Sequence, residues 1–216
     1  MKQYTLYSYF RSSTSIRVRA ALALKGLDYR YEAVSLLDNE QSKARYRSVN
    51  PEGLVPALLT PAGDGLSQSM AIIEYLDEVY PTPALLPSQP LARARVRSLA
   101  QIVGCDIHPI NNLRVLRYLK RELRADQDAI AAWFRRWASA GCQALEQRLA
   151  NDAETGEFSH GNSPTLADIC LYAQVLNNRR FDVDMAPYPT VARVFSACAA
   201  MEAFRAADPA VQPDAQ

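Results

Sequence analysis

The sequence predicts an α/β domain at the N-terminus followed by an all-helical domain. Up to about residue 80, segments rich in Tyr, Val and Thr alternate with helical segments. The stretch 81–87 then places three prolines within seven residues, which neither a helix nor a central strand accommodates. Beyond it, long segments rich in Ala, Leu and Arg carry few strand signals. We therefore predict domains at 1–80 and 89–216, joined by a linker at 81–88.

The first three elements of the N-terminal domain form a βαβ unit. Residues 3–8 and 29–36 are rich in Tyr, Val and Thr with partial alternation, as is typical of strands. Between them, 15–25 carries apolar residues at helical spacing, and Gly26 provides a stop signal. A helical crossover between two strands favours their parallel pairing.

The rest of this domain completes a small sheet, and the second domain reads as helices. We predict a strand at 55–60, a hairpin at 61–65 and a helix at 69–79, which together give a thioredoxin-like arrangement. Long helical patterns follow at 91–123, 126–149, 165–177 and 188–200.

The composition excludes several classes of function. Lys and Arg number 24 against 23 Asp and Glu, so a net charge of +1 gives no reason to expect nucleic acid or an acidic membrane as partner. The start of the chain is too polar for a signal peptide, so we expect none, and no window approaches the roughly 18 apolar residues of a membrane span. The four cysteines form no C-x-x-C pair, and with His108 and His160 they do not suggest a metal site. We interpret all four as buried apolar residues of a cytoplasmic protein: Cys105, Cys142, Cys170 and Cys198.

A run of hydroxyl residues lies between the first predicted strand and the first predicted helix. Ser12, Ser13, Thr14 and Ser15 are consecutive, whereas a helix cap needs only one or two of them. Capping alone is one interpretation of this run. The other is an anion site, because hydroxyls and free N–H groups converge at the positive end of a helix. Such a site stabilises a thiolate, and with every cysteine in the second domain the sulfur must come from a cofactor.

Two dipeptides have both a structural and a functional interpretation. Val55-Pro56 precedes an apolar strand, where the proline marks an edge or a cis bond. Gln68-Ser69 opens the 69–79 helix, where Ser69 can cap and Gln68 can present its amide to a docked carboxylate.

Taken in order, the motifs resemble those of zeta-class glutathione transferases, the maleylacetoacetate isomerases. The N-terminal signature covers 9–26 and includes the hydroxyl run. Further matches are Asn50-Pro51, Val55-Pro56, 68–76, 80–87, 106–112, 165–168, 180–189 and 212–214. The resemblance spans nearly the whole chain and implies a thioredoxin-like glutathione-binding domain followed by the all-helical glutathione-transferase domain.

The resemblance implies glutathione as cofactor and assigns residues to it. Ser12 and Ser13 would lie at the sulfur. The backbone of Val55 would pair with the cysteinyl part, and Gln68 and Ser69 would bind the γ-glutamyl carboxylate.

Three assignments fall in the second domain. His108 and Asn112 match positions near glutathione at the mouth of the helical domain. Asp168 matches a helix-capping box with Thr165 and is therefore a structural residue.

The implied reaction is a glutathione-dependent cis–trans isomerisation, by reversible thiolate addition, of maleylacetoacetate to fumarylacetoacetate. A dianionic substrate requires arginines that hold carboxylates, for which Arg11, Arg114 and Arg180 are the candidates. Arg11 also belongs, with the two serines, to the predicted catalytic set. Arg17 and Arg19 lie within the helix, and we expect them to pair with acidic groups across a domain or dimer interface.

One departure from the family pattern concerns the substrate. The usual Ser-Ser-Cys run reads Ser12-Ser13-Thr14 here, and Ile16 stands where tryptophan is common. Thr14 is a poor nucleophile beside cysteine, and the maleylpyruvate isomerases of gentisate catabolism look similar at this position. Maleylpyruvate is therefore a second possible substrate.

Two further functions are compatible with the same motifs. One is a transferase or dehalogenase acting on α-halo acids, and the other is a glutathione-transferase-like binding module. The resemblance further implies a cytoplasmic homodimer.

Overall fold

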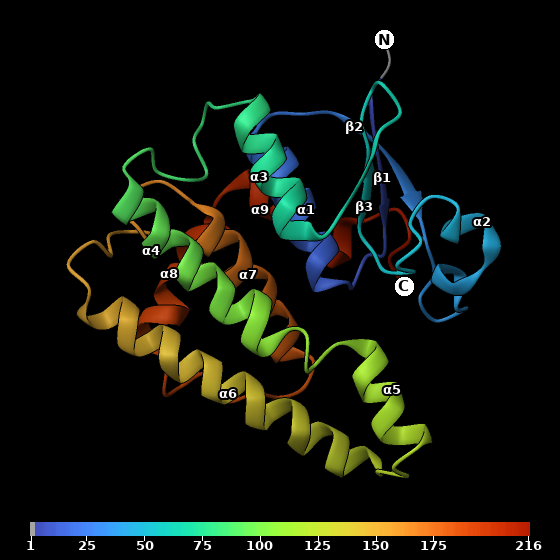
Figure 1. Ribbon diagram of the computed structural model, residues 1–216. Coiled ribbons are helices and arrows are strands. Elements are labelled where there is room, and N and C mark those ends of the chain that lie inside the picture. The colour runs from blue at the N-terminus through green and yellow to red at the C-terminus, as the bar shows by residue number, and fades with distance from the viewer. Residues whose placement is uncertain (1–2) are drawn as a thin grey trace. The chain divides into compact units, whose positions relative to one another are not determined.

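The computed structural model describes residues 3–216, which divide into two compact units (Figure 1). The N-terminal unit runs to Leu85 and takes in the C-terminal segment Ala200–Gln216. The helical unit is Leu86–Ala199. The predicted second domain extended to residue 216, so the last segment belongs with a different unit from the one its position in the sequence suggested.

The N-terminal unit is built on one four-stranded sheet. Its strands are β1 (Tyr4–Ser8), β2 (Tyr29–Ala33), β3 (Ala57–Leu59) and β4 (Gly65–Ser67), in the order β2-β1-β3-β4. The first two are parallel, as the βαβ pattern predicted, with Tyr4 opposite Tyr29. The other two pairs are antiparallel. The predicted thioredoxin-like α/β fold is confirmed.

Two helices of this unit carry the predicted site residues. Helix α1 (Ser13–Leu24) crosses from β1 to β2, and α3 (Ser69–Val79) follows β4 and packs against α1. The sequence analysis did not anticipate the short turns at Glu40–Ser42 and α2 (Ala44–Arg47). The core between these elements consists of buried aliphatic side chains: Leu6, Ile16, Val18, Leu22, Leu58, Ile72, Ile73 and Leu76.

The C-terminal segment adds a further layer to the N-terminal unit. It comprises α9 (Glu202–Ala206) and a 3-10 turn at Pro209–Val211, and α9 packs against α1. Phe204 and Ala207 are fully buried there. So short a helix gains most of its stability from tertiary packing, which explains why its sequence pattern alone did not reveal its partner.

The helical unit contains α4 (Pro90–Gln101), α5 (Leu113–Arg121), α6 (Gln127–Asn151), α7 (Leu166–Arg179) and α8 (Pro189–Ala200). The continuous helix predicted at 91–123 is wrong. After α4 the backbone forms a π-helical turn at Ile102–Ile107, and helical hydrogen bonding stops before α5. Pro109 lies in the gap and lacks the N–H that a continuing helix needs.

Asp168 is the structural residue that the capping motif predicted. Its Oδ2 accepts hydrogen bonds from Thr165 N and Thr165 Oγ1, each at 2.8 Å. Its Oδ1 accepts from Ser159 N at 2.7 Å, so the carboxylate also pins the preceding loop. The side chain is fully buried, and burial raises the pKa of this carboxyl group in spite of its donors.

Replacing Asp168 by alanine should lower the free energy of unfolding by about 3–5 kcal/mol, because it leaves two buried N–H groups and a hydroxyl without an acceptor. Asp126 provides a matched control, since its Oδ1 caps α6 at Ala129 N from an exposed position. Asp126→Ala should lower the free energy by about 1 kcal/mol. Urea denaturation of both variants measures the difference, and equal losses would contradict the role of Asp168 as a buried clamp.

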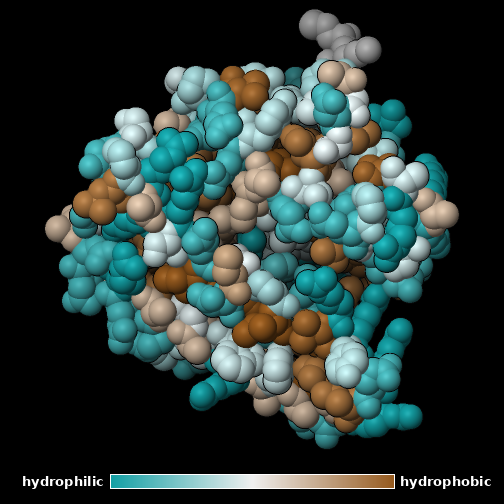
Figure 2. All heavy atoms as spheres, viewed as in Figure 1, coloured by the Kyte–Doolittle hydropathy of each residue, from teal (hydrophilic) through white to brown (hydrophobic). Residues whose placement is uncertain are grey.

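Three of the four cysteines are buried, as predicted, but Cys105 is exposed. Cys105 lies on the π-helical turn, where Val103 and Ile107 take the inward positions and leave it facing outward. Burial raises the pKa of the Cys142 thiol to about 11. Over residues 3–216, no helix is long and apolar enough to cross a membrane. Figure 2 shows hydrophilic and hydrophobic residues interspersed over the visible face.

Candidate active site

Ser12 is the N-cap of α1. Its backbone is extended (φ −69°, ψ 118°), and its Oγ accepts a hydrogen bond from Ser15 N at 3.3 Å. The next amides in the first turn have no carbonyl within the helix to bond. The hydroxyl run therefore begins at a positive helix end, as the sequence predicted.

A chain of hydrogen bonds runs from this cap to the strand that follows Val55. Thr14 Oγ1 lies 2.8 Å from Ser12 Oγ and donates to Val55 O at 2.9 Å. A hydroxyl has one proton, so with Thr14 donating to Val55 it is Ser12 that donates to Thr14. The proton of Thr14 is thus used structurally, and Thr14 joins the hydroxyl run to the Val55-Pro56 peptide, which is cis.

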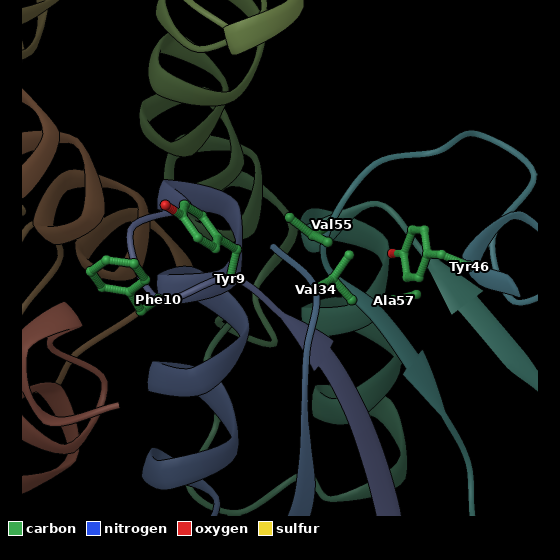
Figure 3. Packing of buried hydrophobic residues seen from close by; sticks show 6 residues of the cluster. All are labelled: Tyr9, Phe10, Val34, Tyr46, Val55 and Ala57. Atoms are coloured by element: carbon green, nitrogen blue, oxygen red, sulfur yellow. The ribbon is translucent and has the colours of Figure 1, made fainter. Parts of the chain in front are cut away.

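An apolar cluster supports this junction from within the N-terminal unit. Tyr9 and Phe10, at the end of β1, form an edge-to-face pair with centroids 4.9 Å apart. Figure 3 shows Val34 and Val55 drawn between this pair and Tyr46, and all five belong to one buried cluster. The cluster fixes the end of β1 against the loop that carries Val55, which holds the hydroxyl run in place.

The start of α3 carries the second predicted subsite. Gln68 has φ 66°, a left-handed conformation that is uncommon for a residue other than glycine. Its exposed amide donates to Glu52 Oε2 at 2.6 Å, and Ser67 Oγ donates to the other oxygen of that carboxylate at 2.7 Å. Non-glycine residues held in this conformation concentrate at ligand sites.

Arg17 lies behind Ser69 and connects the two subsites. Its Nη1 is 3.4 Å from Ser69 Oγ, and the residue is 1% exposed. Its buried Nε and Nη2 have no hydrogen-bond partner among residues 3–216. Within residues 3–216 Arg17 therefore meets no acidic group, and its guanidinium is directed at a hydroxyl at the start of α3; pairing across a dimer interface stays a prediction.

Arg19 likewise binds no acidic group among the described residues. Its guanidinium donates to the carbonyls of Phe10, at 2.8 Å, and Ala207, at 2.9 Å. It also donates to Ser8 Oγ at 3.1 Å. A planar fork of donors suits several converging carbonyls as well as a carboxylate, so the residue type alone did not distinguish the two.

Arg11 projects from the turn just before the hydroxyl run. Its Nη2 donates to Tyr9 Oη at 3.4 Å, and the guanidinium carbon lies 4.7 Å from the centroid of the Phe10 ring. Both contacts are with aromatic residues, and the guanidinium has no acidic partner within residues 3–216. Its buried Nε has no hydrogen-bond partner there.

In the helical unit, His108 and Asn112 contact each other. Asn112 caps α5, its Oδ1 accepting from Arg114 N at 3.1 Å. Its amide nitrogen then faces His108 Nε2 at 3.3 Å, so this ring nitrogen accepts and Nδ1 carries the proton. Arg114 itself is exposed on the first turn of α5.

Helix α6 links this loop to the segment that follows Arg180. Trp133 Nε1 donates to Ile110 O at 3.0 Å. The next residue, Phe134, stacks on Phe181 with centroids 3.7 Å apart. Arg180 is exposed at the end of α7, 5.7 Å above the same Phe181 ring. Two residues that neighbour the predicted set, Ile110 and Phe181, thus contact adjacent residues of α6.

Three residues outside the predicted set shape the N-terminal subsites: Thr14, Arg17 and Glu52. Thr14 was noted only as a departure from a family pattern, and Arg17 only as a helix residue expected to meet an acidic group. A signal was available for Arg17, because an arginine at position five of a helix whose neighbours are Ile16 and Val18 falls in a buried stretch.

The N-terminal unit fits the chemistry of glutathione. A thiolate requires hydroxyls and a helix N-terminus, which Ser12 and α1 provide. A carboxylate requires donors and positive charge, and the start of α3 offers Ser69 backed by the buried, incompletely bonded Arg17.

Comparison with known proteins agrees with this geometry. The family model described as glutathione S-transferase, N-terminal domain, matches residues 11–79. Maleylpyruvate isomerase of Ralstonia sp. is 54% identical over 209 residues, covering 97% of this chain and 98% of its own length. Maleylacetoacetate isomerase of Pseudomonas aeruginosa is 46% identical over 211 residues, 97% of each chain.

Solved structures extend the likeness to three dimensions. A holo structure of maleylpyruvate isomerase, described as a bacterial zeta-class glutathione S-transferase, matches with a TM-score of 0.96 at 52% identity, covering 98% of this chain and 100% of its own. Maleylacetoacetate isomerase from Methylobacterium extorquens AM1, with bound malonate and glutathione, matches with a TM-score of 0.95 at 39% identity, covering 98% and 99%. With such identity over nearly the whole chain, the protein belongs to the zeta class of the glutathione transferases, the family of the maleylacetoacetate and maleylpyruvate isomerases.

Proposed function

We propose that this protein is a glutathione-dependent cis–trans isomerase of a small unsaturated diketo acid, with maleylacetoacetate as first candidate substrate and fumarylacetoacetate as product. The observation that carries the proposal is the hydrogen-bond chain from Ser15 N through Ser12 and Thr14 to Val55 O. It places an orientable hydroxyl at the positive end of α1, beside the backbone expected to pair with the tripeptide.

The residues of this chain act by binding and by stabilising charge. Bound glutathione supplies a thiolate that adds reversibly to the cis double bond, which allows rotation about that bond before the thiolate leaves. Ser12 can turn its proton from Thr14 toward the sulfur, because a hydroxyl rotates freely. Together with the end of α1, this lowers the thiol pKa from about 8.5 toward neutrality. Ser13 is the second hydroxyl proposed near the sulfur.

The remaining cofactor contacts lie at the other predicted residues. Ser69, supported by Arg17, binds the γ-glutamyl carboxylate together with Gln68, which would exchange its present bond to Glu52 for the ligand. The backbone of Val55 aligns the cysteinyl part. His108 and Asn112 complete the cofactor set, with the ring and amide oriented by their mutual contact.

Three arginines are proposed to hold the substrate carboxylates: Arg11, Arg114 and Arg180. Arg11 and Arg180 each lie over an aromatic ring, and this orients the guanidinium without neutralising its charge. Positive groups near the reacting carbonyls stabilise the negative charge that develops on their oxygens.

Maleylpyruvate is the second candidate substrate. Two observations favour it: Thr14 occupies the usual cysteine position, and the maleylpyruvate isomerase of Ralstonia sp. is 54% identical, against 46% for the maleylacetoacetate isomerase of Pseudomonas aeruginosa. A transferase or dehalogenase acting on α-halo acids would need the same thiolate site with an open apolar pocket, which the proposed arginines oppose.

The deciding experiment follows the loss of ultraviolet absorbance of each diketo acid, with and without glutathione. Isomerisation that requires glutathione supports the proposal, and the ratio of the two kcat/KM values names the substrate. Absence of activity on both acids, with glutathione still bound, would reject the isomerase and direct attention to α-halo acids.

Replacing Arg17 by methionine should weaken glutathione binding about 10-fold, because Ser69 loses its charged support. The unliganded protein should become more stable, by about 1 kcal/mol or more, since a buried charge without an acidic partner is removed. Calorimetry and urea denaturation measure the two effects. Ser69→Ala is the partner variant: if Arg17 acts through Ser69, the losses in binding are not additive in the double variant.

We further propose that the protein works in the cytoplasm as a homodimer. The free cysteines and the family resemblance support the two statements respectively. Sedimentation equilibrium at several concentrations tests the dimer, and a monomer at all of them would reject it.

A further inference from the structure

The C-terminal tail reaches the turn between β1 and α1. Phe10 N donates to Asp214 Oδ2 at 3.1 Å, across 204 residues of sequence. The other oxygen of the same carboxylate accepts from Tyr31 Oη at 2.6 Å, which ties the tail to β2. Burial and this hydrogen bond to Asp214 raise the pKa of Tyr31, so it remains a donor at neutral pH.

The carbonyl of Phe10 is held as firmly as its N–H group. Arg19, 1% exposed, donates from Nη2 to Phe10 O at 2.8 Å and to Ala207 O at 2.9 Å. Its Nε donates to Ala207 O at 3.2 Å. Both polar backbone groups of Phe10 therefore depend on the tail. The N–H group donates to Asp214 directly, and the carbonyl accepts from Arg19, which also donates to the tail carbonyl of Ala207.

Hydrogen bonds within the tail hold the segment that carries Asp214 in a defined conformation. Gln212 is 8% exposed, and its Nε2 donates to Ala206 O at 2.9 Å and to Asp208 O at 2.8 Å. Asp208 Oδ1 accepts a hydrogen bond from Ala210 N at 2.9 Å and thereby caps the 3-10 turn at Pro209–Val211.

We infer that Asp214 and Arg19 are positioning residues of the active site, which fix the backbone at Phe10 and thereby aim Arg11 and Ser12. These two residues follow Phe10 directly, so a rotation about its backbone angles displaces both. The inference rests on the proposed function, which gives Arg11 and Ser12 their roles. Under this inference, Asp214 in the C-terminal tail helps to position the residues of the thiolate site.

The test compares two replacements of Asp214. Asp214→Ala removes both acceptors and should lower kcat about 10-fold, as modest misplacement of catalytic groups does, and should raise the pKa of the bound glutathione thiol. Asp214→Asn keeps an oxygen for Phe10 N and an amide nitrogen that can donate to Tyr31 Oη, so it should retain kcat within about 2-fold. Glu202→Ala is the control, because Glu202 is an exposed acidic residue on the first turn of α9, and this variant should leave kcat and the thiol pKa unchanged.

Hydrogen exchange of the peptide covering 9–14 provides a readout that needs no cofactor. Exchange should accelerate in Asp214→Ala but not in Glu202→Ala. If Asp214→Ala only lowers the thermal midpoint, with exchange in 9–14, kcat and thiol pKa unaltered below it, the inference is overturned. If the unaltered protein does not bind glutathione, the proposed function fails, and the exchange comparison still decides whether the tail holds this turn.

Discussion

Replacement of Ser12 by alanine is expected to reduce glutathione-dependent isomerisation at pH 7 by about 100-fold, the largest single effect we predict. Without the hydroxyl, the bound thiol loses a donor proposed for it, and its pKa should rise toward the value of about 8.5 for a free thiol. Because the thiolate is the active form, part of the activity should return as the pH is raised through the new pKa. Thiolate absorbance against pH measures this shift directly.

Ser12 also caps α1, so the two roles must be separated. Loss of the cap should lower the free energy of unfolding by about 1 kcal/mol. Ser12→Gly costs only a few tenths of a kcal/mol as an N-cap and has no side-chain donor for the sulfur. We expect this variant to be nearly as stable as the unaltered protein and as inactive as Ser12→Ala. Recovery of activity with the cap would show that Ser12 serves only the helix.

Replacement of Arg180 by methionine is expected to raise KM for the diketo acid about 30-fold, the second-largest effect. A charge-assisted hydrogen bond to a carboxylate contributes about 1.5–3 kcal/mol, and methionine keeps an unbranched apolar stem without the charge. Binding of glutathione should not change, because Arg180 is proposed for the substrate alone. Steady-state kinetics and calorimetry with glutathione provide the two measurements.

The neighbouring Arg179 is the matched control for Arg180. It is also exposed at the end of α7, and its guanidinium carbon lies 4.5 Å from the centroid of a different ring, Phe195. Arg179→Met removes one positive charge from the same helix end and should leave KM within about 2-fold. Equal increases in KM for the two variants would mean that Arg180 contributes only general electrostatic attraction.

Much of the local structure was predictable, because its signals lie within a few residues of one another. The helix predicted at 69–79 has the bounds found for α3, and the βαβ pattern predicted the parallel pairing of β1 with β2. The capping box at Thr165 and Asp168 likewise depends on a spacing of three residues. Such interactions follow from sequence spacing alone, since the backbone geometry of a helix start is always the same.

The sequence was least informative where a polar side chain had to choose among distant partners. The arginines at 17 and 19 were expected to meet acidic groups, yet one contacts Ser69 and the other binds carbonyls. A guanidinium accepts either kind of partner, and only the path of the chain decides which lies within reach. The break in the 91–123 pattern has a different, local origin, since Pro109 lies in the gap and lacks the N–H that a continuing helix needs.

By itself the sequence determined the family, the two-part architecture with its α/β and helical halves, and the hydroxyl run at a helix N-terminus. The tertiary structure decided that Thr14 joins that run to Val55, 41 residues away, and that Asp214 holds Phe10 from the far end of the chain. It also decided that residues 200–216 complete the N-terminal unit. Local hydrogen bonds are set by spacing, whereas long-range ones form only after burial has brought distant segments together.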